Sequence, residues 1–293
     1  MESFLEKHNA YSAFIQAELS RSLPNGQTSE KVLEAMKYSL LSGGKRLRGI
    51  LVLACCDLVS GNFLTAAPAA VSVEMLHAYS LIHDDLPCMD NDSLRRGKPS
   101  CHIAFGEATA MLAGDALLTL SFETLTSIQD SGVSKKCVSL LSKAAGYRGM
   151  IRGQELDLSA EGVSILPVEK LDEIHSHKTG ALFRASAAMG AVIGNGTPDE
   201  VEAVSRYAEK IGLSFQIIDD ILDATSDDKT LGKTANSDES EQKCTYFSAY
   251  GLERSKEAAC SLTREAVDIA ARCFNKKARF IQRFAEDLLT RIN

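Results

Sequence analysis

The sequence predicts an all-α protein that is built as one large helical bundle. Only 6 of the 293 residues are proline, and residues 199–293 contain none, which allows long uninterrupted helices. Apolar residues recur at helical spacing along almost the whole chain, and no segment shows the sustained alternation of a half-buried strand. No linker or internal repeat divides the sequence, so residues 1–293 are predicted to form one domain.

The first helices are predicted from apolar stripes. One stripe lies in residues 4–19 and a second in residues 32–41, and both show the spacing of an amphipathic helix. The first consists of Phe4, Leu5, Tyr11, Phe14, Ile15 and Leu19. Residues 67–83 and 109–125 are apolar enough that we expect burial on most of their sides.

A later helix has a well-defined start. Thr197 is followed by Pro198, Asp199 and Glu200, which is an N-cap residue, then proline at the first helical position, then acids in the first turn. We expect this helix to continue to about Asp223. Short glycine-containing breaks connect the helices.

Composition and charge argue against a nucleic-acid-binding or a membrane-spanning protein. The formal net charge is −7 and the pI is about 5.5, so a general nucleic-acid surface is not expected. No apolar run reaches the length of a membrane span, which predicts a soluble, cytoplasmic protein. The 8 cysteines contain no CxxC pair and fall mostly among apolar helical residues, so they are interpreted as free thiols.

Two acidic clusters end apolar helices. Asp84 and Asp85 precede Pro87, which disfavours helix at residue 86, and Asp90 follows in the loop. The second cluster has Gln216, Asp219 or Asp220, and Asp223 along one helical stripe. Carboxylates are unfavourable at a helix C-terminus, and local rules are broken mostly at functional sites. All-oxygen ligands without His or Cys at ligand spacing indicate magnesium, although either cluster alone is also compatible with a solvated helix end.

Cations occur in short runs near these clusters. Lys45, Arg46 and Arg48 open a helix after Gly43-Gly44, where free backbone N–H groups and three cations are predicted to converge on an anion. Arg95, Arg96 and Lys98 follow the first cluster, and Lys178, Lys233 and Lys243 complete the set. For Arg46 and Lys98 the solvated interpretation is preferred. Cations beside both acidic clusters, in a chain of negative net charge, predict a diphosphate ligand.

These motifs together resemble the trans-prenyltransferase (polyprenyl synthetase) family, most closely its bacterial farnesyl diphosphate synthases. The resemblance spans residues 43–247 and is carried in order by GGKRLR (43–48), HAYSLIHDDLPCMDNDSLRRGKP (77–99), GDALL (114–118), GQELDL (153–158), HKTGALFRA (177–185), GLSFQIIDDILD (212–223), LGKT (231–234) and KCTYF (243–247).

The resemblance implies roles for individual residues. Magnesium, about three ions per active site with manganese as a possible substitute, would be held by carboxylates. These are Asp84, Asp85, Asp90, Asp219, Asp220 and Asp223. Isopentenyl diphosphate would be bound by Lys45, Arg48, His77 and Arg96, and the allylic diphosphate by Arg95, Lys178, Thr179, Gln216, Lys233 and Lys243. For His77, spacing alone is compatible with a pocket-lining residue or a core histidine.

The resemblance also implies an activity. Isopentenyl diphosphate would be condensed with dimethylallyl or geranyl diphosphate to give farnesyl diphosphate, with Lys178, Thr179 and Gln216 flanking an allylic cation and a loop over residues 233–243 closing on the substrate. Tyr79, five residues before Asp84, would form the floor that sets product length; an ordinary core aromatic is the other interpretation. The fold that the resemblance implies is a helical bundle of the isoprenoid synthase type around a central apolar cavity, and a homodimer is implied as well.

Four departures from the family pattern occur, and none removes a catalytic group. Gly49 stands where the family usually has proline, Ser93 replaces a frequent Asp, and Gln242 and Phe247 replace the usual Gly and Pro. Geranyl or geranylgeranyl diphosphate synthases of the same family remain alternatives. Outside it, a terpene cyclase is disfavoured by the second acidic cluster, and a metal-dependent phosphohydrolase would need further His ligands. A non-catalytic partner subunit of a heteromeric synthase would be expected to lack the acidic motifs, and both are intact here.

Overall fold

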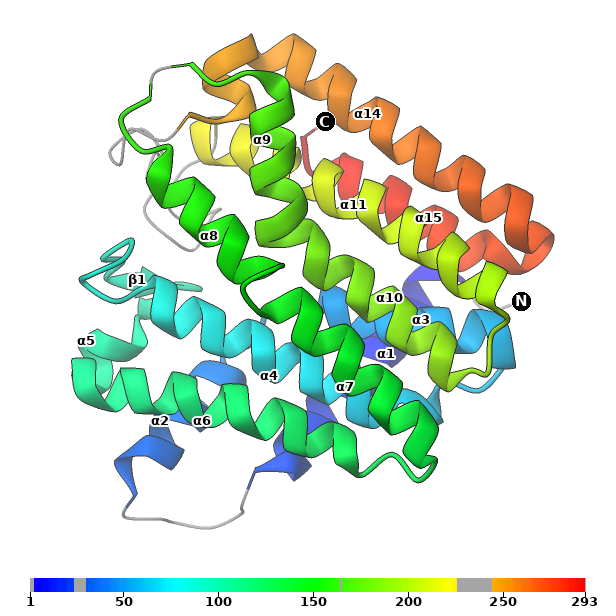
Figure 1. Ribbon diagram of the computed structural model, residues 1–293, viewed down its shortest axis with the longest axis horizontal. Helices are drawn as coiled ribbons and strands as arrows, with labels where there is room; N and C mark the ends of the chain where they lie inside the picture. The colour runs from blue at the N-terminus through cyan, green and yellow to red at the C-terminus, as the bar shows by residue number, and fades with distance from the viewer. Residues whose placement is uncertain (1–2, 24–29, 164, 226–243, 293) are drawn as a thin grey trace.

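A computed structural model describes residues 3–23, 30–163, 165–225 and 244–292. The described chain is almost entirely helical, as predicted, and its helices pack side by side around a central helix (Figure 1). In the first half the elements are α1 (Phe4–Ser22), α2 (Lys31–Leu40), α3 (Leu47–Ser60), η1 (Leu64–Ala66), α4 (Ala67–Asp84), β1 (Leu94–Arg95), β2 (Lys98–Pro99), α5 (Cys101–Phe105), α6 (Glu107–Thr126) and α7 (Ser131–Ala145).

The second half continues the bundle. Its elements are α8 (Met150–Ser159), α9 (Val168–His175), the π-helical segment η2 (Ser176–Gly180), α10 (Ala181–Ile193), α11 (Pro198–Thr225), α14 (Tyr246–Phe274), η3 (Asn275–Ala278), α15 (Arg279–Leu289) and η4 (Thr290–Ile292). Helix α11 packs most extensively on α14, and α4 packs along α6 (Figure 1).

Helix α10 occupies the middle of the bundle. It packs against α3, α4, α7 and α11, and the side chains from Leu182 to Ala191 are almost all buried. The sequence explains this position, because alanine, serine and glycine dominate this stretch and allow neighbouring helices to approach closely. A helix surrounded in this way anchors the elements that carry the acidic clusters.

The predicted helix boundaries are confirmed where they matter for the site. Helix α4 ends at Asp84 with Asp85 as its C-cap, and α11 extends from Pro198 to Thr225. The Thr197 hydroxyl accepts a hydrogen bond from the Glu200 N–H at 3.2 Å, and the Glu200 carboxylate accepts one from the Thr197 N–H at 2.8 Å. This reciprocal pair is a capping box, which fixes the start of α11.

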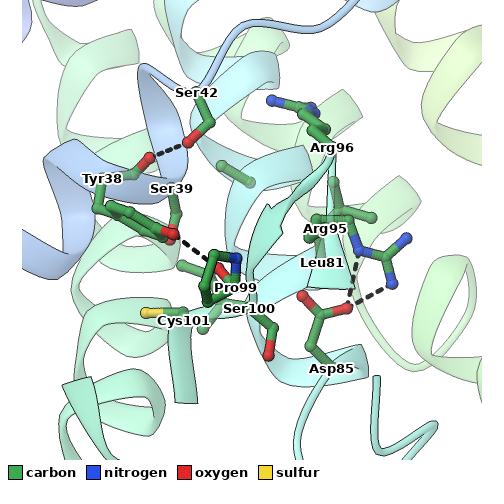
Figure 2. A pocket seen from close by; sticks show the side chains of 12 residues that line it. Tyr38, Ser39, Ser42, Leu81, Asp85, Arg95, Arg96, Pro99, Ser100 and Cys101 are labelled. Carbon is green, nitrogen blue, oxygen red and sulfur yellow. Dashed lines mark hydrogen bonds and ion pairs between the residues drawn. The ribbon is translucent and has the colours of Figure 1, made fainter. Parts of the chain in front are cut away.

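Strand structure is minimal in the described residues. The strands β1 and β2 form one antiparallel hairpin, in which Arg95 pairs with Lys98 and Leu94 with Pro99. The hairpin is anchored on α2, because the Tyr38 hydroxyl donates a hydrogen bond to the Pro99 carbonyl at 2.7 Å (Figure 2). It therefore holds Arg95 and Arg96 beside the end of α4.

Two expectations about burial are wrong. Leu5 is 64% exposed, because it points away from the face of α1 that carries Tyr11, Ile15 and Leu19. Helix α6 is buried on one side only, with Met111 and Leu112 exposed, because it is an outer helix of the bundle. Apolar composition alone did not reveal that α6 has an open face.

Every cysteine is a free thiol, and four of the eight are fully buried. Within the described ranges, no helix combines the length and the apolar character needed to cross a bilayer.

Candidate active site

Both acidic clusters open onto one cavity of about 950 Å³. Its walls come from the end of α4 and the following loop, from α6, α8 and η2, and from the second half of α11. Thirteen of the residues predicted for the site line it. They are Arg48, His77, Tyr79, Asp84, Asp90, Arg95, Arg96, Lys178, Thr179, Gln216, Asp219, Asp220 and Asp223. The fold thus brings together segments that are far apart in the sequence.

The carboxylates of the first cluster carry an unfavourable concentration of negative charge. Burial raises the pKa of Asp84 to about 6; the charges of Asp90 and Asp85 add to this effect, and Lys178 opposes it. Asp90 and Asp92 line the same cavity. A raised carboxyl pKa means that the ionised form lacks full compensation from the protein, which is the condition that a bound cation would relieve.

Asp85 faces away from this cavity into a smaller pocket, where it is paired with Arg95 (Figure 2). The Arg95 Nε donates to Asp85 Oδ1 at 2.8 Å, Nη2 contacts the same oxygen, and Nη2 also reaches Asp92 Oδ2 at 2.8 Å. Burial raises the pKa of Asp85 to about 6, and Arg95 acts in the opposite direction. Asp85 therefore fixes the guanidinium of Arg95, which itself lines the main cavity.

Arg95 and Arg96 point in different directions although they are adjacent (Figure 2). Arg96 has a left-handed backbone conformation, with φ of 56°, and its guanidinium donates to the carbonyl of Gly43 at the start of the GGKRLR segment. Burial lowers the pKa of Arg96, and the nearby charge of Arg46 lowers it further. The turn thus divides two neighbouring cations between two parts of the site.

The GGKRLR segment contributes Arg48 to the cavity. Its guanidinium lies 3.3 Å from His77 Nε2 and 4.9 Å from the centre of the Phe183 ring. Burial lowers the pKa of Arg48 to about 10, and burial together with Arg48 holds the pKa of His77 well below its usual range. His77 is therefore a neutral acceptor in the pocket wall. The buried Arg48 Nε has no acceptor among the described residues, which fits an anionic ligand.

Arg46 was predicted to be solvated, or to join Lys45 and Arg48 on one anion, and both expectations are wrong. It is 4% exposed, and its guanidinium donates to Gln16 Oε1 at 2.9 Å and to the Leu40 carbonyl at 2.8 Å. Glu74 Oε2 lies 3.4 Å away as the buried counter-charge. The reason is its position as the N-cap of α3 in a left-handed conformation, which turns the side chain inward.

Lys45 and Lys98 lie outside the cavity lining, and both are exposed. Although the residue as a whole is exposed, partial burial of its ammonium group lowers the pKa of Lys45, with Arg291 acting in the same direction and Asp219 against it. Lys45 therefore lies within electrostatic reach of the second acidic cluster. Lys98 lies 6.0 Å from the Tyr38 ring and agrees with its solvated interpretation.

Lys178 and Thr179 lie in the π-helical segment η2, a distortion that is often found at functional sites. Lys178 Nζ lies 2.5 Å from Asp157 Oδ2 on α8. Helix α8 can approach η2 because Gly153 has no side chain. A Cβ at that position would lie 2.1 Å from the backbone nitrogen of Lys178. Asp157 lies in the GQELDL stretch but was not predicted as a site residue, because sequence spacing does not reveal a partner on another element.

A chain of hydrogen bonds orients Gln216. The Thr179 hydroxyl donates to Gln216 Oε1 at 2.8 Å, and Gln216 Nε2 donates to Asp220 Oδ1 at 3.1 Å. Asp220 also accepts the Tyr246 N–H at 3.1 Å, and His175 Nε2 lies 3.8 Å from it. Burial raises the pKa of Asp220 to about 7. The oxygens of Asp220 are thus already used by protein donors, and they fix the amide toward the cavity.

Two further features of the lining concern its apolar and C-terminal parts. Tyr79 is 6% exposed, lines the cavity, and packs edge-on against the ring of His83.

Arg291, from η4, pairs with Asp219 at 2.8 Å and lies over the Phe215 ring at 5.2 Å. Nothing in the sequence pattern singled out Arg291, a lone cation near the C-terminal end, and its buried Nη1 has no acceptor among the described residues.

The donor set fits magnesium. The acidic side chains that line the cavity offer carboxylate oxygens, which are the ligands that magnesium prefers. The raised pKa of Asp84 indicates that neighbouring cations only partly compensate its negative charge. Across residues 3–23, 30–163, 165–225 and 244–292, no three His, Cys, Asp or Glu side chains form a metal cage by themselves. Magnesium held by a few carboxylates takes its other ligands from water and substrate phosphate. Lys233 and Lys243, and the expected loop over residues 233–243, lie outside the described residues.

The chain is similar to known proteins along most of its length. A sequence model described as polyprenyl synthetase matches residues 29–283. The large subunit 1 of the heterodimeric geranylgeranyl pyrophosphate synthase of Arabidopsis thaliana, a chloroplastic protein, is 53% identical over 245 residues; these cover 81% of this chain and 66% of the relative. The chain thus spans slightly less than two thirds of that relative's length.

Two solved structures share the fold. The geranyltransferase of Helicobacter pylori, complexed with magnesium and isoprenyl diphosphate, has a TM-score of 0.89 at 33% identity and covers 99% of both chains. An FPP/GFPP synthase of Zymomonas mobilis, in its apo form, has a TM-score of 0.86 at 35% identity and covers 98% of both chains.

Proposed function

Because the chain belongs to the polyprenyl synthetase family, we propose that it condenses isopentenyl diphosphate with an allylic diphosphate to give a short-chain isoprenyl diphosphate. One observation carries the proposal: a single large cavity has carboxylates from two distant segments and buried cations with unused donors. Such a surface suits a ligand that is a magnesium diphosphate at one end. The apolar residues of the same cavity, among them Tyr79, Leu118 and Phe215, suit a hydrocarbon tail.

Asp84, Asp90 and Asp219 are the magnesium ligands in this proposal, with Asp223 beside them. Asp85 faces the smaller pocket, and both oxygens of Asp220 accept hydrogen bonds from protein donors, so we assign them to positioning Arg95 and Gln216, respectively. Bound magnesium would neutralise charge on the diphosphate leaving group.

The cations divide between the two substrates. Arg48, Arg96 and Lys45 are assigned to isopentenyl diphosphate, with His77 fixing Arg48. Arg95 and Lys178 are assigned to the allylic diphosphate, because each is paired with a carboxylate next to the acidic clusters. Lys233 and Lys243 retain the same assignment from the sequence. Arg291 joins the set through its contact with Asp219.

The reaction then follows from charge. The allylic C–O bond breaks, and Arg95 and Lys178 stabilise the negative charge that collects on the departing diphosphate. Gln216 and Thr179 present oxygen lone pairs to the allylic cation, since the Gln216 nitrogen is anchored on Asp220. The double bond of isopentenyl diphosphate supplies the electron pair of the new C–C bond. A proton then leaves the adduct for the released diphosphate, and a new double bond forms. The apolar wall excludes water, which would otherwise capture the cation.

For product length we propose farnesyl diphosphate. The support is Tyr79, a bulky buried ring that lines the cavity about 7.5 Å from Asp84 along α4, at ~1.5 Å per residue. A second candidate, geranylgeranyl diphosphate, is favoured by the name of the Arabidopsis relative. The two differ only in where the growing chain is stopped.

The test is incubation of the purified chain with magnesium, isopentenyl diphosphate and dimethylallyl diphosphate, followed by chromatography of the dephosphorylated products. A fifteen-carbon alcohol supports the proposal, and a twenty-carbon alcohol supports the second candidate. The Tyr79→Ala variant should make longer products with condensation preserved. A parent protein that forms no condensation product under these conditions would refute the proposed function.

Assembly and location are further proposals. We propose that two copies of the chain associate, whereas the Arabidopsis relative is named as the large subunit of a heterodimer. Light scattering of the purified chain distinguishes a dimer from a chain that awaits a different partner. The cytoplasm is the proposed location, and the chloroplastic relative provides the alternative that fluorescence microscopy of the tagged chain would detect.

A further inference from the structure

Tyr79 is one of two aromatic rings stacked along α4. His83 lies one helical turn later on the same face, and the two ring centres are 5.6 Å apart at an interplanar angle of 85°. Both side chains line the cavity. An edge-to-face pair of this kind restrains both rings, so the position of Tyr79 depends on where His83 is held.

His83 is held from the opposite side by α6. Its Nε2 lies 3.1 Å from the Met111 carbonyl oxygen, which can only accept, so Nε2 carries the proton and donates. The same nitrogen lies 3.9 Å from Asp115 Oδ1. The imidazole therefore spans the gap between α4 and the backbone of α6.

Gly114 provides the space for this contact. A Cβ at residue 114 would lie 2.1 Å from His83 Nε2 and 2.4 Å from His83 Cδ2, so any side chain there would displace the ring. Glycine inside a helix is less favourable than alanine by roughly 1 kcal/mol, yet Gly114 lies well inside α6. The close approach of His83 accounts for glycine at this position.

We infer that His83 and Gly114 are specificity-determining positioning residues, which act on product length through Tyr79. The inference rests on the proposed function. When the imidazole packs against Gly114, its contact with the Tyr79 ring prevents that ring from rotating, and the ring continues to block the cavity. Without the imidazole, the ring can turn into the vacated space and the hydrocarbon chain can pass. With a methyl group at residue 114, the imidazole is driven off α6 toward the cavity that it lines, which shortens the space for the chain.

The two single substitutions should therefore act in opposite directions. His83→Ala should raise the ratio of the next longer product to the parental product by on the order of tenfold, which corresponds to an aromatic contact worth roughly 1.4 kcal/mol. Gly114→Ala should enrich a product one isoprene unit shorter. In the double variant the methyl group has no imidazole to displace and partly fills its place, so the product distribution should return toward that of the parent.

Product ratios are measured at early turnover with isopentenyl and dimethylallyl diphosphates, so a change in rate does not affect them. Thr119→Ala, an exposed position on the same helix, is the control and should keep the parental ratio. If Gly114→Ala fails to fold while the double variant folds, the contact itself is confirmed, and His83→Ala supplies the length measurement.

The possible failures are distinguishable. If Tyr79→Ala lengthens the product and both single variants retain the parental ratio, the role of His83 and Gly114 is overturned while the proposed function stands. If the parent condenses nothing, the proposed function fails, and this inference fails with it.

Discussion

Lys178 owes its position to Asp157, a residue 21 positions earlier in the chain. The two side chains are partly buried, and Asp157 reaches Lys178 only because α8 lies against η2 at Gly153. An ammonium group on a flexible stem loses considerable rotamer entropy when it is held in one place. The carboxylate thus restrains Lys178, which would prepare it for the diphosphate that we propose it binds.

Asp157→Asn should lower kcat/KM for the allylic substrate by about tenfold, because Lys178 is then less restrained. Lys178→Gln should cost more, and the double variant should be no worse than Lys178→Gln alone, since the two residues act as one unit. Steady-state kinetics with geranyl diphosphate provide the measurement, and Glu173→Gln, in an exposed ion pair, is the control. Additive losses in the double variant would show that Asp157 acts independently of Lys178.

His175 is the buried histidine behind Asp220. Burial lowers its pKa to about 4, whereas an unfolded histidine has a pKa of about 6.5. The unfolded chain therefore binds this proton first as the pH falls, and the contribution of His175 to stability is lost between about pH 6.5 and pH 4. The carboxyls with raised pKa values, such as Asp220, act in the opposite direction, but they are common to the parent and to a His175 variant.

His175→Asn should remove this pH dependence. Between pH 7.5 and pH 5, the parent should lose about 2 kcal/mol of unfolding free energy relative to the variant. Urea titrations of both proteins, without magnesium, at a series of pH values give the difference directly. Parallel stability curves would mean that His175 is already protonated in the folded protein or equally inaccessible in both states.

At the scale of elements, the start of α3 is fixed by a buried ion pair rather than by a helix cap made within its own segment. Glu74 on α4 accepts the Gly49 N–H at 2.9 Å with one oxygen and pairs with Arg46 through the other. The N–H of Gly49 is a donor that a proline at this position would lack. The departure at Gly49 therefore adds a contact between α3 and α4, next to Lys45 and Arg48.

Glu74→Gln should lower the unfolding free energy by about 3 kcal/mol, because it leaves the charge of Arg46 buried without a counter-charge. Glu286→Gln removes a carboxylate from an exposed pair with Arg283 and should cost less than about 0.5 kcal/mol. Urea unfolding followed by circular dichroism measures both. Equal small losses in the two variants would mean that Arg46 finds another partner or becomes solvated.

At the scale of the whole molecule, the cavity is lined by elements from both halves of the chain. The carboxylates of α4 and α11 and the cations of α3, β1 and η2 belong to elements distributed along the sequence. Magnesium and diphosphate would complement each other in such a site. Magnesium would relieve the repulsion between the carboxylates, and diphosphate would accept hydrogen bonds from the buried arginine donors that lack acceptors among the described residues. Their binding is therefore expected to be cooperative.

Magnesium and inorganic diphosphate together should raise the melting temperature by more than the sum of their separate effects. A ligand at a hundredfold excess over its Kd stabilises the native state by about 2.7 kcal/mol. Differential scanning fluorimetry with an added dye measures the shift. Asp84→Asn should abolish the excess, whereas Asp268→Asn, on the surface of α14, should retain it. An undiminished shift in EDTA would contradict the role of the metal.

The local sequence determined the helical fold, the ends of α4 and the start of α11, and the two acidic clusters. It could do so because these features depend on periodicity, on caps and on proline, which act within a few residues. The same locality explains the misjudged positions. Whether Arg46 or Arg48 points inward, and which face of α6 is covered, depends on neighbours from other helices.

Only the tertiary structure decided the pairings. Asp157 with Lys178, Asp85 with Arg95, Arg291 with Asp219, and His83 over Gly114 each join residues on different elements. Such contacts depend on how far one helix slides and rotates against another, and the packing of the whole bundle fixes this register. The sequence could thus identify the chemical groups of the site, whereas the packing of the helices determined which groups face the cavity and which hold them in place.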